Sequence, residues 1–124
     1  MVKRKTKVSD GVIEILKKAA SPLSAFQILD QLKYNGLYPN KTTIYRIINK
    51  LLNTRVISEI ATKNKGNVYE LFTKNHFHFI CNQCDDISCL DDDKAINIDA
   101  LISDKKFKIE SKNFNFYGVC ELCL

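Results

Sequence analysis

Lys41-Thr-Thr-Ile-Tyr-Arg-Ile-Ile-Asn-Lys-Leu-Leu52 is the segment with the clearest pattern in the chain. Starting from Ile44, its aliphatic residues recur at i, i+3, i+4, i+7 and i+8, which predicts a helix with one stripe against a core. The opposite stripe is polar, aromatic and basic, the side-chain types that contact bases and phosphates in a DNA groove. The candidate DNA-binding residues are Lys41, Thr42, Tyr45, Arg46 and Asn49. An ordinary amphipathic helix with a solvated polar face would show the same pattern.

The flanking segments favour the DNA interpretation. A helical period begins at Val12 and ends at Ser21-Pro22, and a capping box at Ser24-Ala-Phe-Gln27 opens a second helix that Gly36 ends. Two β-prone runs, residues 56–60 and 67–72, are joined by the turn-forming Thr62-Lys-Asn-Lys-Gly66. Three helices and a hairpin with a basic tip predict a winged helix-turn-helix over residues 1–74. The basic residues before the first helix, Lys3 to Lys7, are expected to form an arm along the minor groove.

Length and charge limit the possible functions. With 124 residues the chain has room for one domain or two very small ones, which excludes a large enzyme. Residues 1–74 carry 14 basic and 5 acidic side chains, a net +9, whereas residues 75–124 carry 5 and 9, a net −4. The basic half suits DNA and the acidic half suits cations, although short charge runs can also be solvated surface. Because no apolar run approaches the roughly 20 residues of a membrane span and no signal peptide is evident, a cytoplasmic protein is expected.

The cysteines of residues 75–124 point to a structural metal. This half is expected to be a small α/β unit with strands at 77–81, 107–111 and 114–117 and a helix near 95–105, which makes the whole chain α+β. Two C-x-x-C pairs, Cys81/Cys84 and Cys120/Cys123, are separated by 35 residues. Four thiolates of this kind form a closed tetrahedral zinc site. A four-sulfur iron centre is an alternative, and a redox C-x-x-C is less compatible because that motif usually occurs singly.

A second cluster of potential ligands lies near the first cysteine pair. His76 and His78 are spaced i, i+2, so in a strand they share a face. Glu59, Glu70 and Cys89 offer oxygen and sulfur ligands to complete a sensor site, and nitrogen with sulfur favours zinc over iron or manganese. Taken singly, each residue is better explained by surface polarity or, for Cys89, by a small buried apolar side chain, and only their combination favours a metal site.

Three of these segments together resemble the ferric uptake regulator (Fur) family. They are residues 41–52, His76-Phe-His-Phe-Ile-Cys-Asn-Gln-Cys84 and Tyr117-Gly-Val-Cys-Glu-Leu-Cys123, and Ser24-Ala-Phe-Gln-Ile-Leu-Asp30 adds a fourth. The resemblance implies a homodimeric transcription regulator, usually a repressor, with a winged helix at residues 1–74 and a metal-binding dimerisation domain at residues 75–124. It also implies that Tyr45 and Arg46 contact a double-stranded DNA operator and that the four paired cysteines bind structural zinc.

The sensor residues depart from the iron-type pattern of that family. Pro22 replaces a sensing histidine, Cys89 stands where a carboxylate ligand is common, and Asp85 replaces the glycine after the first cysteine pair. Asn75 and Phe77 occupy the positions of a further His-x-Asp site, so that site is expected to be absent. What remains is more similar to the zinc uptake regulators (Zur), which predicts Zn²⁺ as the regulatory metal and Fe²⁺ as the alternative.

Two other classes of function compete with a regulator. A small zinc-ribbon protein could use its amino-terminal helices to bind another protein rather than DNA. A thiol oxidoreductase would need an exposed cysteine of low pKa, whereas paired C-x-x-C motifs predict sulfurs that are bound to metal. The sequence therefore predicts a protein that is not an enzyme.

Overall fold

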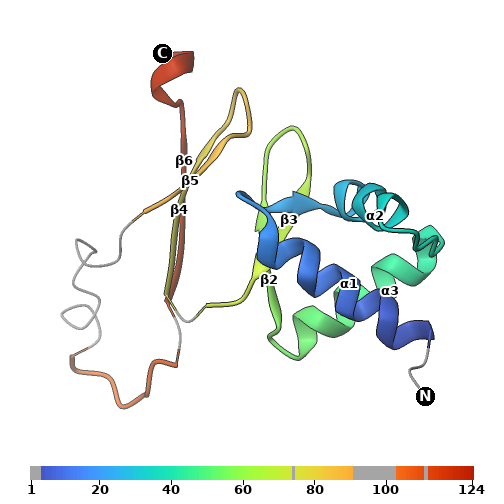
Figure 1. Cartoon of the computed structure of the whole chain (residues 1–124). Coiled ribbons are helices and arrows are strands. Elements are labelled where there is room, and N and C mark those ends of the chain that lie inside the picture. The colour runs from blue at the N-terminus through green and yellow to red at the C-terminus, as the bar shows by residue number, and fades with distance from the viewer. Residues whose placement is uncertain (1–3, 74, 91–102, 111) are drawn as a thin grey trace. The chain divides into compact units, whose positions relative to one another are not determined.

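The computed structural model describes residues 4–73, 75–90, 103–110 and 112–124, and only the backbone of residues 4–6, 75 and 76. The chain divides into two compact units, Met1–Phe72 and Thr73–Leu124; the sequence predicts residues 1–74 and 75–124 for the two parts. Figure 1 follows the chain by colour from the first unit into the second. None of the described helices combines the length and apolar character that crossing a bilayer requires.

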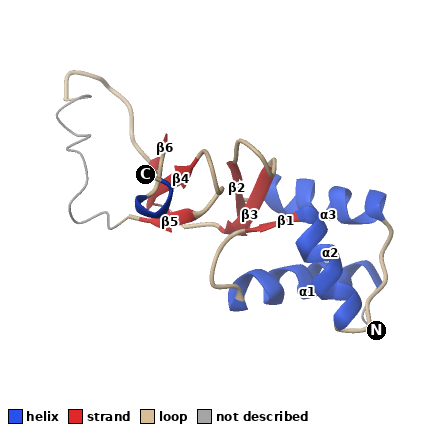
Figure 2. Cartoon of the chain, turned by 90° about the horizontal axis from the view of Figure 1, so that it is seen from above, coloured by secondary structure: helices blue, strands red, loops and turns tan. Residues whose placement is uncertain are grey.

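Three helices form most of the first unit: α1 (Arg4–Lys18), α2 (Ala25–Tyr34) and α3 (Lys41–Asn53). Figure 2 shows them beside the small sheet of the same unit. The predicted positions of α2 and α3 are confirmed, but α1 begins earlier than Val12. Val8 is buried and continues the apolar stripe of α1 by one turn toward the amino terminus, so the helix includes Arg4, Lys5 and Lys7. The expected arm is therefore helical from Arg4 onward.

Side-chain caps define where α2 and α3 begin. The Ser24 Oγ accepts a hydrogen bond from the Gln27 amide at 3.1 Å, and the Ser24 amide donates to Gln27 Oε1 at 2.9 Å. This reciprocal pair is the predicted capping box. At α3 the Asn40 Oδ1 accepts from the Thr43 amide at 2.8 Å. Each cap satisfies amide groups that the first helical turn leaves without an intrahelical acceptor.

The wing is a three-stranded antiparallel sheet in the order β1-β3-β2. The predicted hairpin is confirmed as β2 (Ile57–Ala61) and β3 (Asn67–Leu71). Its turn closes when the Thr62 amide donates to the Gly66 carbonyl at 2.9 Å, and Gly66 has φ +75°, which glycine adopts without strain. The two-residue β1 (Leu23–Ser24) pairs with β3 and was not predicted, because two residues show no periodicity.

One core joins the three helices to the sheet. It contains buried aliphatic side chains from every helix together with Ile57 and Tyr69 of the wing. α1 and α2 approach each other closely at Gly11, where an added Cβ would lie 2.8 Å from Leu32 Cδ2 and 3.2 Å from Leu37 Cδ1. A side chain at position 11 would therefore require the Leu32 and Leu37 side chains to shift. The core holds α3 with its polar stripe outward.

The second unit is built on a three-stranded sheet in the order β5-β4-β6. β4 (Asn75–Cys81) is central, pairs antiparallel with β5 (Ile87–Cys89) and parallel with β6 (Lys112–Gly118), and a short 3₁₀ helix, η2 (Glu121–Cys123), follows. The rings of Phe77 and Phe114 stack across β4 and β6 with centroids 5.3 Å apart. This ring stacking adds a side-chain contact to the hydrogen bonds between the two strands.

One prediction for this unit is wrong, one lies mostly outside the described residues, and one strand was not predicted. Residues 107–110, the described part of the strand predicted at 107–111, have no regular secondary structure, and β5 was not predicted. The predicted helix near residues 95–105 falls mostly within 91–102, which lie outside the described residues, and its end at 103–105 is a turn. β5 was missed because Ile87-Ser-Cys89 is too short to show alternation.

Candidate metal centre and nucleic-acid interface

The two cysteine pairs meet at one end of the β4–β6 ladder. Cys81 ends β4 opposite Gly118 of β6, and because the strands are parallel their carboxyl ends deliver both C-x-x-C turns to the same place. Four sulfur atoms, the Sγ atoms of Cys81, Cys84, Cys120 and Cys123, all lie within 4.8 Å of one another. The Cys84 and Cys120 sulfurs are 3.8 Å apart. Tetrahedral zinc with Zn–S bonds of about 2.3 Å separates its sulfurs by a similar distance, so these residues fit zinc.

Backbone amides stabilise the thiolate form of one of these sulfurs, which is the form that binds metal. The Cys81 Sγ accepts hydrogen bonds from the amides of Gln83, Cys84 and Cys120 at 3.4, 3.5 and 3.4 Å. The amides of Cys84 and Cys120 lower the pKa of the Cys81 thiol to about 6, because they stabilise the thiolate. In contrast, the hydrogen bond with the Cys120 side chain raises the pKa of Cys123 to about 12. Without metal, the crowded sulfurs do not all ionise together.

Asp85 makes the turn after the first pair. Its φ is +60° and its amide donates to the Cys81 carbonyl at 2.9 Å. Aspartate is one of the few non-glycine residues that enter this left-handed region readily. The departure from the glycine of the family pattern therefore preserves the turn.

Two of the predicted sensor residues lie face to face in the second unit. His78 of β4 is 2% exposed and pairs with Cys89, the exposed last residue of β5. A ring nitrogen of His78 lies within 4.8 Å of the Cys89 sulfur. His76 is two residues earlier in β4, opposite Asn113 of β6. The structure thus brings a nitrogen and a sulfur ligand together on neighbouring strands.

The two predicted glutamates belong to the first unit and lie on opposite faces of its sheet. Glu70 of β3 pairs with Ser58, whereas Glu59 of β2 pairs with Tyr69. Cross-strand partners share a face and neighbours along a strand alternate, so Glu59 and Glu70 point in opposite directions. The register thus puts the two predicted glutamate ligands on different faces of β2–β3, and their part in a metal site stays a prediction. Glu70 is half-buried and Glu59 is exposed.

The outward stripe of α3 carries all five predicted DNA-binding residues. Lys41, Thr42, Tyr45, Arg46 and Asn49 are exposed, while Ile44, Ile47, Ile48 and Leu51 are buried. Lys63 and Lys65 at the wing tip are exposed as well. Basic and hydrogen-bonding groups on a helix and its adjoining wing can contact the major groove and the flanking phosphates.

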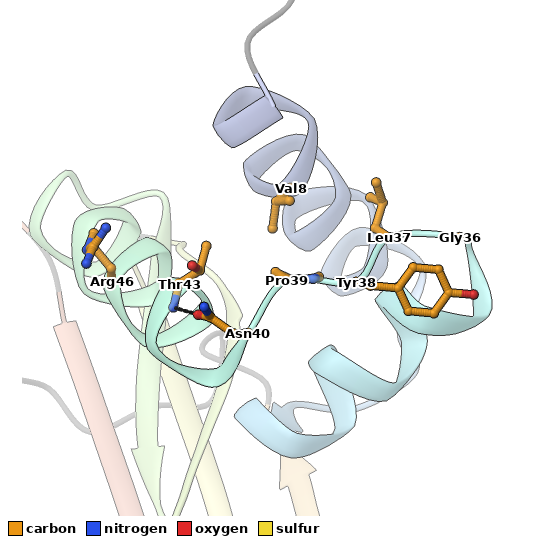
Figure 3. A pocket seen from close by; sticks show the side chains of 8 residues that line it. All are labelled: Val8, Gly36, Leu37, Tyr38, Pro39, Asn40, Thr43 and Arg46. Carbon is orange, nitrogen blue, oxygen red and sulfur yellow. Dashed lines mark hydrogen bonds between the residues drawn. The ribbon is translucent and has the colours of Figure 1, made fainter.

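A pocket of about 440 Å³ adjoins the amino-terminal part of α3. Arg46, Thr43 and Asn40 line it on the α3 side, the turn from Gly36 to Pro39 closes another side, and Val8 of α1 contributes an apolar wall. Figure 3 shows these side chains and the hydrogen bond that the Thr43 amide donates to the Asn40 side chain. Neither Asn40 nor Thr43 is among the predicted site residues, although an asparagine immediately before a helical period is a cap signal and marks Asn40.

This chain is similar to proteins of known family in both sequence and structure. A profile of the Ferric uptake regulator family matches residues 3–117. The ferric uptake regulation protein of Campylobacter jejuni is 32% identical over 83 residues, which are 65% of this chain and 53% of that protein. The protein of the same name from Helicobacter pylori is 24% identical over 122 residues, 97% of this chain and 81% of that protein.

Two solved structures show the same fold. The ferric uptake regulator of Helicobacter pylori, described as having three functional metal-binding sites, superposes with a TM-score of 0.82 at 23% identity and covers 95% of this chain and 82% of that one. The Campylobacter jejuni peroxide stress regulator gives a TM-score of 0.81 at 21% identity, with 97% and 91% covered. With the family profile over nearly its whole length, this chain belongs to the Ferric uptake regulator family, whose members are metal-responsive transcription regulators.

Proposed function

We propose that the protein is a homodimeric, zinc-responsive repressor that binds duplex operators of metal-homeostasis genes. The pairing of His78 with Cys89 carries the zinc assignment. Imidazole with thiolate is a donor set that suits zinc, whereas oxygen-rich sets suit harder ions. Glu70 and His76 are the proposed additional ligands of this regulatory site, and the four paired cysteines hold a separate structural zinc.

The proposed DNA contacts come from the exposed stripe of α3. Arg46 and Asn49 are suited to hydrogen bonds with base edges, while Lys41 and Thr42 are suited to phosphates. Tyr45, the fifth proposed contact, lies between these two pairs of residues in the sequence of α3. Regulation follows if the metal-loaded dimer presents its two α3 helices at the spacing of an operator, since the metal then binds the DNA-competent state more tightly and DNA in turn strengthens metal binding.

Iron sensing is the second candidate. It is favoured by the names of the relatives, because the Campylobacter and Helicobacter proteins that match this chain are ferric uptake regulators. Zinc and iron differ in the ligands they prefer, so the composition of the second site discriminates between the two functions.

The test combines metal content with DNA binding. Protein purified without added metal is dialysed against excess Zn²⁺ or Fe²⁺ under reducing conditions, and metal per chain and affinity for a duplex selected from a random pool are measured. One zinc retained throughout, with a second zinc that raises DNA affinity at least tenfold, supports the proposal. A second site that fills with Fe²⁺ in preference to Zn²⁺ supports iron sensing instead.

Variants connect this response to the site. His78→Ala is expected to lose the second metal and the metal-dependent rise in affinity while it retains one zinc and the dimer. Ser88→Ala, a neighbour of Cys89 on β5 that belongs to neither cluster, serves as the control and is expected to respond like the natural chain. A His78→Ala protein whose DNA binding still responds to metal contradicts the assignment.

A further inference from the structure

The pocket of about 440 Å³ beside α3 contains two polar side chains, Thr43 and Asn40, to which the proposed function gives no role. We infer that this pocket receives one sugar-phosphate unit of the operator backbone, with the phosphate held by Thr43, Asn40 and Arg46. The inference rests on the proposed DNA binding and deepens it, because it assigns a backbone phosphate to a defined site next to the exposed stripe of α3.

The polar side chains of the pocket offer hydrogen-bond donors to an anion. Of the eight described residues that line it, Arg46 alone is charged, and none carries a carboxylate. The Asn40 Oδ1 accepts the Thr43 amide at 2.8 Å, so the Nδ2 amino group is what Asn40 can offer to an anion. The Thr43 hydroxyl and the Arg46 guanidinium donate as well. The oxygen acceptors of a phosphate complement this set, and the guanidinium makes the hydrogen bonds charge-assisted.

The remaining wall of the pocket is apolar and suits the carbon atoms of deoxyribose. Val8 of α1 supplies it together with Leu37 and Pro39 of the turn before α3. Val8 is 6% exposed and belongs to the core, and Leu37 packs against the same core, so packing holds this wall in place. Figure 3 shows Thr43 between Arg46 and Pro39, with Val8 on the neighbouring helix. A phosphate bound at Thr43 therefore brings its sugar against an apolar surface.

Position and charge favour a DNA strand over a small free anion as the occupant. The pocket adjoins the exposed stripe of α3, because Arg46 belongs to both. Lys7 is exposed and directly precedes the lining residue Val8. Lys41 is exposed and directly follows Asn40. Because a DNA backbone is continuous, it places further phosphates on either side of the one in the pocket, and the two lysines attract these.

The experiment neutralises one phosphate at a time in a duplex that the natural chain has selected. A methylphosphonate replaces each backbone phosphate in turn, which removes its charge and nearly keeps its size. Affinities are measured for the metal-loaded natural chain and for Thr43→Val, which loses the hydroxyl and keeps the shape of the side chain. Thr54→Val is the matched control, because the Thr54 hydroxyl lies at the other end of α3 and donates to the Lys50 carbonyl at 2.9 Å. Thermal unfolding of each variant checks that the fold is retained.

Neutralising one phosphate in each half-site is expected to weaken binding of the natural chain about tenfold, and Thr43→Val to weaken binding of the unmodified duplex about fivefold. On the duplex neutralised at that phosphate, Thr43→Val is expected to lose less than about twofold further, because its hydroxyl has already lost the charged acceptor. Thr54→Val should respond to each methylphosphonate as the natural chain does.

Two results overturn the inference. One is a Thr43→Val protein that binds the unmodified duplex as tightly as the natural chain does. The other is a loss in Thr43→Val that is equally large on every duplex, whichever phosphate is neutralised. If the natural chain selects no duplex at all, the proposed function itself fails, which is a distinct result.

Discussion

His78 lies directly opposite Cys89 across the β4–β5 ladder, with a ring nitrogen within 4.8 Å of the sulfur. The histidine is buried and therefore restrained by packing, whereas the cysteine ends a three-residue strand and is exposed. Such a pair offers a metal ion one ligand that packing holds in place and one ligand that is exposed to solvent. A thiolate at this position is the chemical feature that separates the proposed zinc site from a carboxylate-containing iron site.

Replacing that thiolate is expected to change which metal binds. Cys89→Asp supplies a harder oxygen ligand at the same strand position, so preference at the second site shifts from Zn²⁺ toward Fe²⁺. Competition between the two ions under anaerobic conditions, with metal counted per chain, measures the shift. Cys89→Ser is the companion variant and is expected to weaken binding of both ions without reversing the order. An unaltered preference in Cys89→Asp excludes Cys89 as a ligand.

Loss of the four-sulfur site is expected to unfold the second unit alone. Cys81 accepts three backbone amide hydrogen bonds and ends the central strand, so Cys81→Ser removes one ligand of the proposed structural zinc and replaces the sulfur that holds the cysteine turns. Circular dichroism and amide hydrogen exchange should show loss of β4 and β6 protection while α2 and α3 stay protected. Cys89→Ser, outside this cluster, should keep one zinc. A Cys81→Ser chain with fully protected β4 contradicts this expectation.

Removing the cap of α3 is expected to cost about 1 kcal/mol of unfolding free energy. Asn40→Ala leaves the Thr43 amide without its side-chain acceptor, which is 2.8 Å away. Fraying of the first turn also displaces Lys41 and Thr42, so DNA affinity should fall further than global stability does. Urea unfolding and a DNA titration measure the two effects. Asn53→Ala, at the other end of α3, is the control and should change both quantities little.

Gly11→Ala is expected to destabilise the first unit by about 1 kcal/mol. The new methyl group meets Leu32 Cδ2 at 2.8 Å, and Leu32 is fully buried, so overpacking exceeds the gain in helix propensity that alanine brings. Adding Leu32→Val makes room and should recover part of the loss. Chemical denaturation of the single and double variants tests this, and an Asp10→Ala variant on the exposed side of α1 provides the reference. A more stable Gly11→Ala would show that α1 and α2 are less tightly packed.

The stability of the fold is expected to fall at alkaline pH because of Tyr69. Burial, Glu59 and Tyr45 raise its pKa above 10.0, so an unfolded tyrosine ionises before the folded one. Its stabilising contribution is therefore complete below about pH 10 and is lost as the pH rises through the raised pKa. Tyr69→Phe should flatten the dependence of the urea midpoint between about pH 9 and 11. Tyr34→Phe removes a phenol that is 90% exposed and should leave the slope unchanged.

Local patterns were sufficient for α2 and α3, but not for the start of α1. Apolar spacing predicts both helices and the Ser24 capping box predicts the start of α2, and the two C-x-x-C turns identify the four sulfurs that the structure brings within 4.8 Å of one another. Strands were harder: β1 and β5 have two and three residues, too few for alternation to appear, and residues 107–110 alternate like a strand but have no strand partner among the described residues.

By itself, the sequence determined a winged helix with a polar α3 stripe and a paired-cysteine metal site, because helix periodicity, caps and turn spacing are properties of neighbouring residues. Only the tertiary structure decided which distant side chains share a face. Pairing Glu70 with Ser58 and Glu59 with Tyr69 sends the two glutamates to opposite sides of one sheet. Register depends on contacts between strands, and a shift of one residue would exchange the two faces.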